Sequence, residues 1–521
     1  MAEQTALDIK FTQRFSGNLL SNIVYFVLNL IIGLALAPFF LDTLGPAAYG
    51  LIPLATSVTS YITLLIDSVN ASVSRFLTID LQKGDIAAAN KTFNTALFGT
   101  LGIIVLLIPV ALTAALLAPQ FFNIGEQSYT SVFLLFALVF ASVLIRAWSS
   151  NFMVTLFANN RLDYRNYVNI TNLLMQIALI VLLFSLFGPS LVYVGISYFI
   201  AAVAAFILAY ILSKKICPYL KIQPKNFVLS RFKEIGNVAL WMGFNALGSL
   251  FYGHIGLMVV NKFFGEISGT QYSLCLMWGT LLISTAGLIT NTFTPMIYSH
   301  YAKNNREGML RFTKFTIKVT GLVMALPIGL VYIFAPQLMT FWVGAEYAGL
   351  ALIIWILLSP LMCQVQASCI SPINAAYKRV RIPAIGNFLA GMINLALALS
   401  LPFIFDIGMY GVAIAYAVSM FFLTGFVSPF YNAYVVGAPV FTYFKYMLMG
   451  MAVTALLVAA GMVYSSVVPV DSLIMLIASG LLISVVYLVI VLRCVLKKDE
   501  RKMIRACVPK KLELLIPEWV L

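Results

Sequence analysis

Apolar segments long enough to cross a lipid bilayer follow one another almost without pause from Asn18 to Leu492. A bilayer core about 30 Å thick needs about 20 apolar residues per helix. Because backbone polar groups in hydrocarbon must be satisfied internally, such segments fold as α-helices. The composition agrees, since 62% of the 521 residues are hydrophobic, 10% are charged and the mean hydropathy is +0.98. The sequence therefore predicts an all-α polytopic membrane protein with no room for a soluble catalytic domain, and we expect it not to be an enzyme.

Fourteen transmembrane helices are predicted from the apolar runs. Their approximate bounds are 18–41, 51–74, 93–117, 131–158, 170–187, 192–211, 235–260, 272–298, 315–333, 350–372, 384–405, 411–436, 446–465 and 473–492. With a cytoplasmic N-terminus, every Lys and Arg except Lys262 and Arg146 lies on the cytoplasmic side, in a loop, in a tail or at the inner end of a span, as the positive-inside rule requires. We therefore expect both termini in the cytoplasm. The net charge of +14 is assigned to loops that face anionic lipid, not to nucleic acid.

Metal, cofactor and targeting motifs are not expected in this chain. The six cysteines show no C-x-x-C spacing and there are only two histidines, so we interpret the cysteines as structural. The N-terminal segment "MAEQTALDIKFTQRFSGN" is polar for too long to be a cleaved signal peptide. The first apolar run is therefore predicted to be a permanent span, and no cofactor is expected.

Three short matches at nearly one offset indicate an internal repeat. The tripeptide "APQ" recurs at 118–120 and 335–337, and "LVYVGISY" (191–198) resembles "GMYGVAIAY" (408–416). The turn "TLGPAAYG" (43–50) likewise matches "FFGEISGTQYS" (263–273). These matches predict two pseudo-symmetric six-helix lobes followed by two extra helices, the arrangement of many transporters. The predicted segments are a cytoplasmic tail (1–17), the N-terminal lobe (18–212), a basic cytoplasmic linker (213–233), the C-terminal lobe (234–436), helices 13 and 14 (437–492) and a basic cytoplasmic tail (493–521).

Polar residues recur at helical spacing within several of the predicted spans. The longest stripe, on the second helix, consists of Thr56, Ser60, Thr63, Asp67, Asn70 and Ser74, at steps of four and three. Such stripes can be interhelical hydrogen-bonding groups, or they can line a water-filled cavity. We favour a hydrated substrate cavity lined by Asn22, Asn29, Thr63, Asp67, Asn70, Arg146, Asn245, His254, Ser284 and Asn291.

Two ionisable residues stand out because charges within a membrane span are costly and commonly functional. Asp67 lies about 10 Å from the inner end of the second predicted helix, and Arg146 lies near the middle of the fourth. One interpretation is a purely structural ion pair between them. The other assigns Arg146 to an anionic group of the substrate, through its guanidinium fork, and Asp67 to ion coupling.

The two-lobe plan, "LGPAAYG" (44–50), "SRF" (74–76), "QKGD" (82–85) and "FFGEISGTQYS" (263–273) together resemble the Wzx-like polysaccharide and O-antigen flippases of the multidrug/oligosaccharidyl-lipid/polysaccharide superfamily. The resemblance implies movement of a polyprenyl-diphosphate-linked oligosaccharide to the outer leaflet of a bacterial inner membrane, by alternating access coupled to an ion gradient. It also implies a polysaccharide polymerase and a chain-length regulator as partners. Members of the family often hold several cavity cations, whereas here Arg146 is the one basic residue that the spans clearly enclose, with Arg75 and Arg311 as cytoplasmic alternatives.

Three other functions remain open from the sequence. A cation-coupled multidrug extruder would usually have twelve helices, and a flippase for the peptidoglycan lipid precursor would be expected to carry more cavity cations. A membrane glycosyltransferase or polymerase is opposed by the short external loops and by the lack of clustered carboxylates near a membrane boundary.

Overall fold

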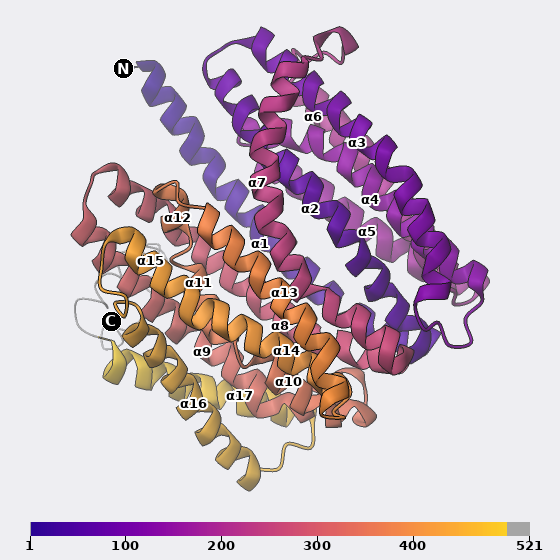
Figure 1. Ribbon diagram of the computed structural model, residues 1–521, viewed down its shortest axis with the longest axis vertical. Helices are drawn as coiled ribbons and strands as arrows, with labels where there is room; N and C mark the ends of the chain where they lie inside the picture. The colour runs from indigo at the N-terminus through magenta and orange to yellow at the C-terminus, as the bar shows by residue number, and fades with distance from the viewer. Residues whose placement is uncertain (1, 497–521) are drawn as a thin grey trace. The chain divides into compact units, whose positions relative to one another are not determined.

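The computed structural model describes residues 2–496, and for residues 2–16, 19, 65, 82, 238, 241, 242, 245, 246, 291, 292, 295 and 494 it describes the backbone alone. Helices account for the regular structure of this part of the chain, which contains no strand (Figure 1). The predicted all-α class is therefore confirmed. Most of the predicted C-terminal tail lies outside the described residues, and the predicted N-terminal tail is helical from Ala2.

The described chain divides into two compact units, residues 1–273 and 274–521. The first unit contains α1 (Ala2–Leu44), α2 (Pro46–Gln82), α3 (Ile86–Phe121), α4 (Tyr129–Ala158), α5 (Leu162–Phe187), α6 (Leu191–Ile216), a short 3-10 turn (Pro224–Asn226), α7 (Leu229–Gly253) and the beginning of α8 (Ile255–Ala302).

The second unit contains the rest of α8, followed by shorter and more broken helices. They are α9 (Arg306–Val343), η2 (Ala345–Leu350), α10 (Ala351–Leu358), α11 (Leu361–Ser368), α12 (Pro372–Ala376), α13 (Arg381–Ile404), α14 (Met409–Phe422), η3 (Leu423–Val427), α15 (Ser428–Val436), α16 (Phe444–Val467), α17 (Leu473–Ile490) and η4 (Val491–Val495). Side-chain caps begin several helices in both units: Asp85, Ser128, Ser190, Asn305 and Ser472 each accept a hydrogen bond from a backbone N–H of the first turn.

Twelve helices of the described residues are long and apolar enough to cross a membrane, and there are thirteen if Ala345–Leu358 and Leu361–Ala376, bent by 41°, form one span. The predicted seventh and eighth helices account for the difference from fourteen, because a single apolar stretch, Leu247–Thr290, covers both. That stretch has 44 residues, about 66 Å of helix, roughly twice the bilayer core. Gly265 interrupts it with φ 90° and ψ 172°, a conformation that favours glycine. The count of fourteen stays a prediction.

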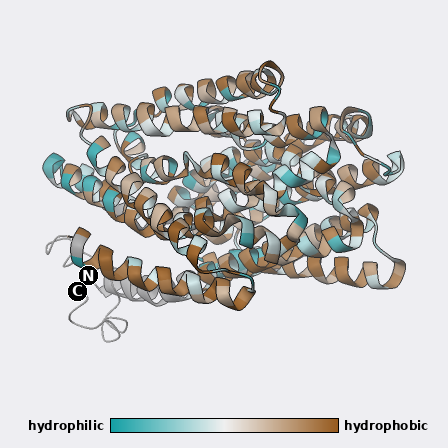
Figure 2. Ribbon diagram, turned by 90° about the horizontal axis from the view of Figure 1, so that it is seen from below, coloured by the Kyte–Doolittle hydropathy of each residue, from teal (hydrophilic) through white to brown (hydrophobic). Residues whose placement is uncertain are grey.

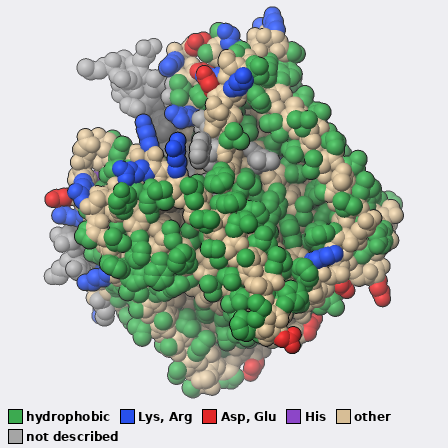
Figure 3. All heavy atoms as spheres, viewed as in Figure 1, with side chains coloured by type: hydrophobic (Ala, Val, Ile, Leu, Met, Phe, Trp, Pro, Cys, Tyr) green, Lys and Arg blue, Asp and Glu red, His purple; other side chains and the backbone are tan. Residues whose placement is uncertain are grey.

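Apolar side chains cover the outside of the helices, as a hydrocarbon environment requires. Figure 2 shows that most helices are hydrophobic along their length, and Figure 3 shows that hydrophobic side chains cover most of the face in view. Leu106 on α3, Val467 on α16 and Ile474 on α17 are each exposed by three-quarters or more. Exposed apolar surface on this scale would be a liability in water and fits a lipid-facing surface.

Helix α7 packs with the first unit, although the predicted repeat assigns it to the second lobe. Arg231 on α7 bonds both carboxylate oxygens of Asp80 on α2, at 3.0 and 3.1 Å, and its guanidinium lies 4.4 Å from the ring centre of Phe76. At the beginning of α8, Asn261 exchanges hydrogen bonds of 3.1 and 3.2 Å with Asn123, which follows α3. The compact unit therefore ends at residue 273, and the predicted lobe boundaries stay a prediction.

Two asparagines of α3 hold the linker between α6 and α7. Asn90 accepts from the N–H of Lys221 and donates to the carbonyl of Tyr219, and Asn94 accepts from Gln223 and donates to Lys221, at 2.7 to 3.0 Å. Successive turns place the two asparagines about 6 Å apart along the helix, close to the spacing of about 6.6 Å between alternate residues of an extended chain. Each side-chain amide therefore pairs with the linker as a neighbouring strand would.

In the second unit, glycines allow α16 to lie directly against α9. A Cβ at Gly450 would lie 3.3 Å from the Cα of Gly321, and a Cβ at Gly461 would lie 2.2 Å from Cδ1 and 2.6 Å from Cγ1 of Ile333. Small residues at such crossings let helix backbones approach closely in membranes.

Replacing Gly461 with alanine is expected to lower the free energy of unfolding by about 1–2 kcal/mol, because the cost of overpacking exceeds the gain in helix propensity. Thermal unfolding of the purified protein in detergent measures this. Gly480→Ala on α17 is the control, since a Cβ there meets nothing within 4 Å and should leave the melting temperature equal or higher. Equal melting temperatures for both variants would contradict the close α9–α16 contact.

Candidate functional site

The first unit contains a cavity of about 1000 Å³ among its helices. Its polar lining comes from α2, α4 and α5, with Tyr25 of α1 and Ala205 of α6 completing the wall. The polar lining residues are Thr63, Asp67, Asn70, Ser74, Arg75, Thr78, Arg146, Ser149, Ser150, Arg165, Asn169 and Asn172. All of them belong to segments predicted to cross the membrane or to their cytoplasmic ends.

The predicted polar stripe of α2 lines this cavity along its second half. Thr63, Asp67, Asn70 and Ser74 face it at steps of four, three and four. The first two residues of the stripe, Thr56 and Ser60, do not line the cavity and return hydrogen bonds to carbonyls of their own helix. The spacing therefore identified the correct face, and the cavity occupies about half of the predicted length.

Three arginines, Arg75, Arg146 and Arg165, project into the cavity without a protein partner. None of them forms a hydrogen bond or an ion pair with another residue in the described part of the chain. A guanidinium group presents five N–H donors in a fixed fork and stays charged. Together they offer a set of donors that suits an anion with several oxygens.

The other arginines of this unit whose side chains are described are satisfied by the protein, which makes the cavity arginines distinctive. Arg161 bonds both oxygens of Asp163 at 2.8 and 2.9 Å, and Arg231 is held by Asp80. The hydrogen bonds from Arg161 to Asp163 raise the pKa of this guanidinium above its ordinary value. The free arginines are therefore confined to the surface that a ligand could reach.

Asp67 is the acidic residue of the cavity lining, and the positive charges of Arg165 and Arg146 act on it. Neither arginine is close enough to form an ion pair with it. The structural ion pair between Asp67 and Arg146, one of the two interpretations of the sequence, is thus not formed. With three arginines and one aspartate, the cavity lining carries a net positive charge.

Arg165 was missed as a cavity residue because helix five was predicted to begin at residue 170, whereas α5 begins at Leu162. The helix starts earlier because its polar first turns are capped and paired by the protein. A signal was available: the polar residues Asn169, Asn172 and Gln176 extend back to Arg165 at the same steps of four, three and four.

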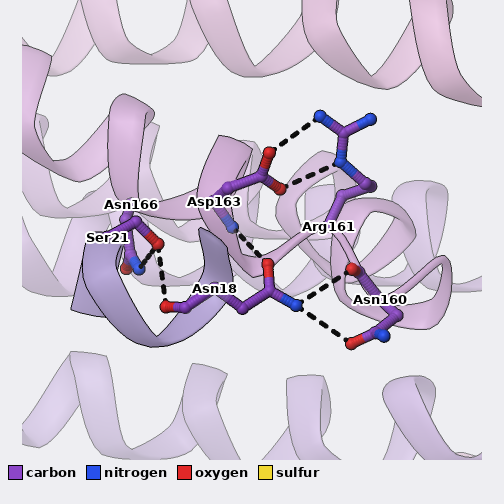
Figure 4. Close-up of polar contacts among 6 residues, drawn as sticks. All are labelled: Asn18, Ser21, Asn160, Arg161, Asp163 and Asn166. Atoms are coloured by element: carbon purple, nitrogen blue, oxygen red, sulfur yellow. Dashed lines mark hydrogen bonds and ion pairs between the residues drawn. The ribbon is translucent and has the colours of Figure 1, made fainter. Parts of the chain in front are cut away.

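A cluster of polar contacts fixes the beginning of α5 and hence the position of Arg165 (Figure 4). Asn18 of α1 accepts from the backbone N–H of Asp163 at 3.0 Å and donates to both the carbonyl and the side-chain oxygen of Asn160 at 3.2 Å. Asn166 donates to the hydroxyl of Ser21 and to the side-chain oxygen of Asn22 at 2.9 and 2.7 Å. Since Arg161 already neutralises Asp163, that carboxylate does not compete for Arg165.

The other predicted site residues do not line this cavity. Asn22 belongs to the α1–α5 contact, Asn29 is exposed on α1, and His254 lies at the break between α7 and α8. Ser284, in the second unit, returns a hydrogen bond to Thr280. The side chains of Asn245 and Asn291 lie outside the described ones.

Trp148 packs inside the protein and is not placed to stack on a sugar. Its indole N–H donates to the carbonyl of Leu97 at 3.3 Å, and its ring stacks on Phe206 with centroids 5.3 Å apart. Aromatic lining is limited to Tyr25 and Phe157, so recognition of a neutral ligand here would depend mainly on hydroxyl and amide groups.

Comparisons with known proteins match most of the chain. A family model described as "Polysaccharide biosynthesis protein" matches residues 16–301. EpsK of Bacillus subtilis (strain 168), described as an uncharacterized membrane protein, is 26% identical over 499 residues, covering 95% of this chain and 97% of that protein.

Two solved structures share the fold. An inward-facing multidrug resistance MATE family transporter of the MOP superfamily superposes with a TM-score of 0.65 at 16% identity, covering 83% of this chain and 95% of the other. The lipid II flippase MurJ, in an inward closed conformation, gives a TM-score of 0.66 at 14% identity, covering 94% of this chain and 99% of the other. At these identities the likeness concerns the fold.

Proposed function

Because the chain belongs to the polysaccharide biosynthesis protein family and has the fold of MOP-superfamily transporters, we propose that it is a flippase for a polyprenyl-diphosphate-linked oligosaccharide. The resemblance expected from the sequence is thereby confirmed at the level of family and fold. The cargo would be a surface-polysaccharide or O-antigen repeat unit that moves from the cytoplasmic to the outer leaflet by alternating access. The protein would lie in a bacterial inner membrane with both termini in the cytoplasm, and a polymerase and a chain-length regulator would act on the delivered unit.

The three unpaired arginines of the cavity are the observation that carries this proposal. A diphosphate that joins a lipid to a sugar bears a negative charge on each phosphate, and charge-assisted hydrogen bonds to guanidinium groups are the strong ones. Arg75, Arg146 and Arg165, offset by Asp67, leave a net charge opposite to that of a diphosphate. A hydrophobic cationic drug would meet repulsion in the same cavity, which favours the flippase over a multidrug extruder.

Asp67 is the candidate for ion coupling. It is a carboxylate within a span, without an ion pair among the described residues, beside two arginines that a substrate would neutralise. Binding of a diphosphate would remove the local positive charge that favours ionised Asp67, so uptake of a proton or cation at Asp67 would be linked to loading of the cavity.

Deleting the gene tests the function directly. We expect the lipid-linked repeat unit to accumulate on the cytoplasmic leaflet and the corresponding surface polysaccharide to disappear, because polymerisation outside needs the flipped unit. Mass spectrometry of extracted polyprenyl diphosphates identifies the accumulated glycan. Accumulation of the peptidoglycan precursor would instead favour the alternative in which this chain flips that lipid, and an unchanged lipid pool would contradict both.

A further inference from the structure

We propose that Asn172 binds the sugar attached to the diphosphate and thereby distinguishes a loaded lipid carrier from a sugar-free polyprenyl diphosphate. This inference rests on the proposed function, because it assigns one part of the same cavity to one part of the same cargo. In this proposal the cavity arginines hold the diphosphate, and Asn172 recognises the saccharide.

The position of Asn172 follows from the face of α5 that lines the cavity. Arg165, Asn169 and Asn172 succeed one another at steps of four and three, so they share that face. Asn172 lies seven residues beyond Arg165, about 10 Å along the helix axis. A diphosphate bound by the arginine would therefore extend its attached sugar along α5 toward Asn172.

The side-chain oxygen of Asn172 is a buried acceptor that receives no hydrogen bond from the described protein. The residue is 9% exposed and it lines the cavity. The amide of Asn166 on the same helix is engaged, since it donates to Ser21 and Asn22 of α1. A buried acceptor without a partner is costly, and native proteins rarely keep one without a functional reason.

The chemistry of the cargo identifies the group that would satisfy this oxygen. An ionised diphosphate has acceptor oxygens and no donor, so it cannot pair with the carbonyl of Asn172. A saccharide carries hydroxyl groups, and an acetamido sugar adds an N–H, each of which can donate. Of these two parts of the cargo, the sugar is the one that can donate to the oxygen of Asn172, and the diphosphate is left to the arginines.

A leucine in place of Asn172 separates this role from a structural one. Leucine has nearly the same shape and removes a polar atom that the empty protein leaves unpaired, so we expect the melting temperature to stay equal or to rise. Binding of polyprenyl diphosphate bearing one N-acetylglucosamine should weaken about tenfold, while binding of the sugar-free polyprenyl diphosphate should stay within twofold of wild type. Isothermal titration of the purified full chain in nanodiscs measures both affinities.

Ser185→Val on α5 is the matched control, since Ser185 is exposed, does not line the cavity and returns its hydrogen bond to its own helix. It should bind both lipids as wild type does. The inference is overturned if Asn172→Leu weakens the binding of both lipids equally or of neither. It is also overturned if the wild type binds both lipids with the same affinity, which is the result expected if a water molecule alone satisfies the oxygen. If the wild type binds neither lipid, or Arg146→Ala leaves both affinities unchanged, the proposed function fails instead.

Discussion

Replacing Arg146 with alanine is expected to weaken binding of polyprenyl diphosphate by about 10- to 100-fold. The guanidinium lies in the cavity with no partner in the described protein, so its donors are available to the phosphate oxygens. Hydrogen bonds to charged groups contribute about 1.5–3 kcal/mol each, and every 1.4 kcal/mol is a tenfold change in affinity. Arg146→Lys should retain part of the affinity, since lysine keeps the charge and loses the bidentate fork.

The stability of the same variant distinguishes ligand binding from a structural role. Because Arg146 forms no ion pair, Arg146→Ala should not lower the melting temperature of the empty protein. Arg311→Ala is the control for general loss of positive charge, as Arg311 is exposed on α9 and does not line the cavity. A melting temperature that falls while affinity persists would show that Arg146 is a structural residue.

Asp67 provides a second check on this interpretation. If Asp67 and Arg146 balanced each other structurally, the double variant Asp67→Asn, Arg146→Ala would restore what either single change removes. Since the two residues form no ion pair, we expect no restoration of surface polysaccharide in a deletion strain. Recovery to wild-type levels by the double variant would favour the structural pair.

Replacing Asp80 with alanine is expected to lower the free energy of unfolding by about 3 kcal/mol. Asp80 is buried, its two carboxylate oxygens accept from Nη2 of Arg231, and it also accepts from the hydroxyl of Thr92 at 2.5 Å. Removing one partner of such a pair leaves the other charge uncompensated, which costs about 3–5 kcal/mol for a fully buried pair. The side chain of Arg231 is 25% exposed, which places the expected loss at the lower end. Thermal unfolding in detergent measures it.

Glu234 supplies a control on the same arginine. It also bonds Arg231 at 3.0 Å, but its side chain is 57% exposed, so Glu234→Ala should cost no more than about 0.5 kcal/mol. A similar loss for both variants would contradict the distinction between a buried anchor of α7 and a surface ion pair.

The features that were predicted best from the sequence, the helices and the cavity face of α2, depend on short-range periodicity. Apolar length identified the helices, and the polar stripe of α2 identified the face that lines the cavity, because both follow from helical spacing. The beginning of α5 was predicted too late, since hydropathy does not detect polar turns that are held by Asn18 and Arg161. This single boundary hid Arg165 and made the cavity look less cationic than it is.

Long-range packing could not be predicted in the same way. Arg231 was predicted to lie in the basic cytoplasmic linker, and its partners include Asp80 and Thr92, which lie far earlier in the chain. Likewise, nothing in the spacing of Trp148 distinguishes a ring that packs on Phe206 from one that faces a sugar. The partners of these side chains depend on which helices pack together, and the spacing of residues within one helix does not reveal its neighbours.

The pairing of Asn90 and Asn94 with the linker has a consequence for how this chain can change over time. In the linker, both amides bond backbone atoms, those of Tyr219, Lys221 and Gln223, so this part of its path depends on side chains of α3. The exposed side chains of Lys221 and Ile222 can therefore change while the route stays the same, whereas Cys217 and Leu220 are buried and stay constrained. The sequence of the linker alone does not predict this path, because the side chains that hold its backbone lie more than a hundred residues earlier in the chain.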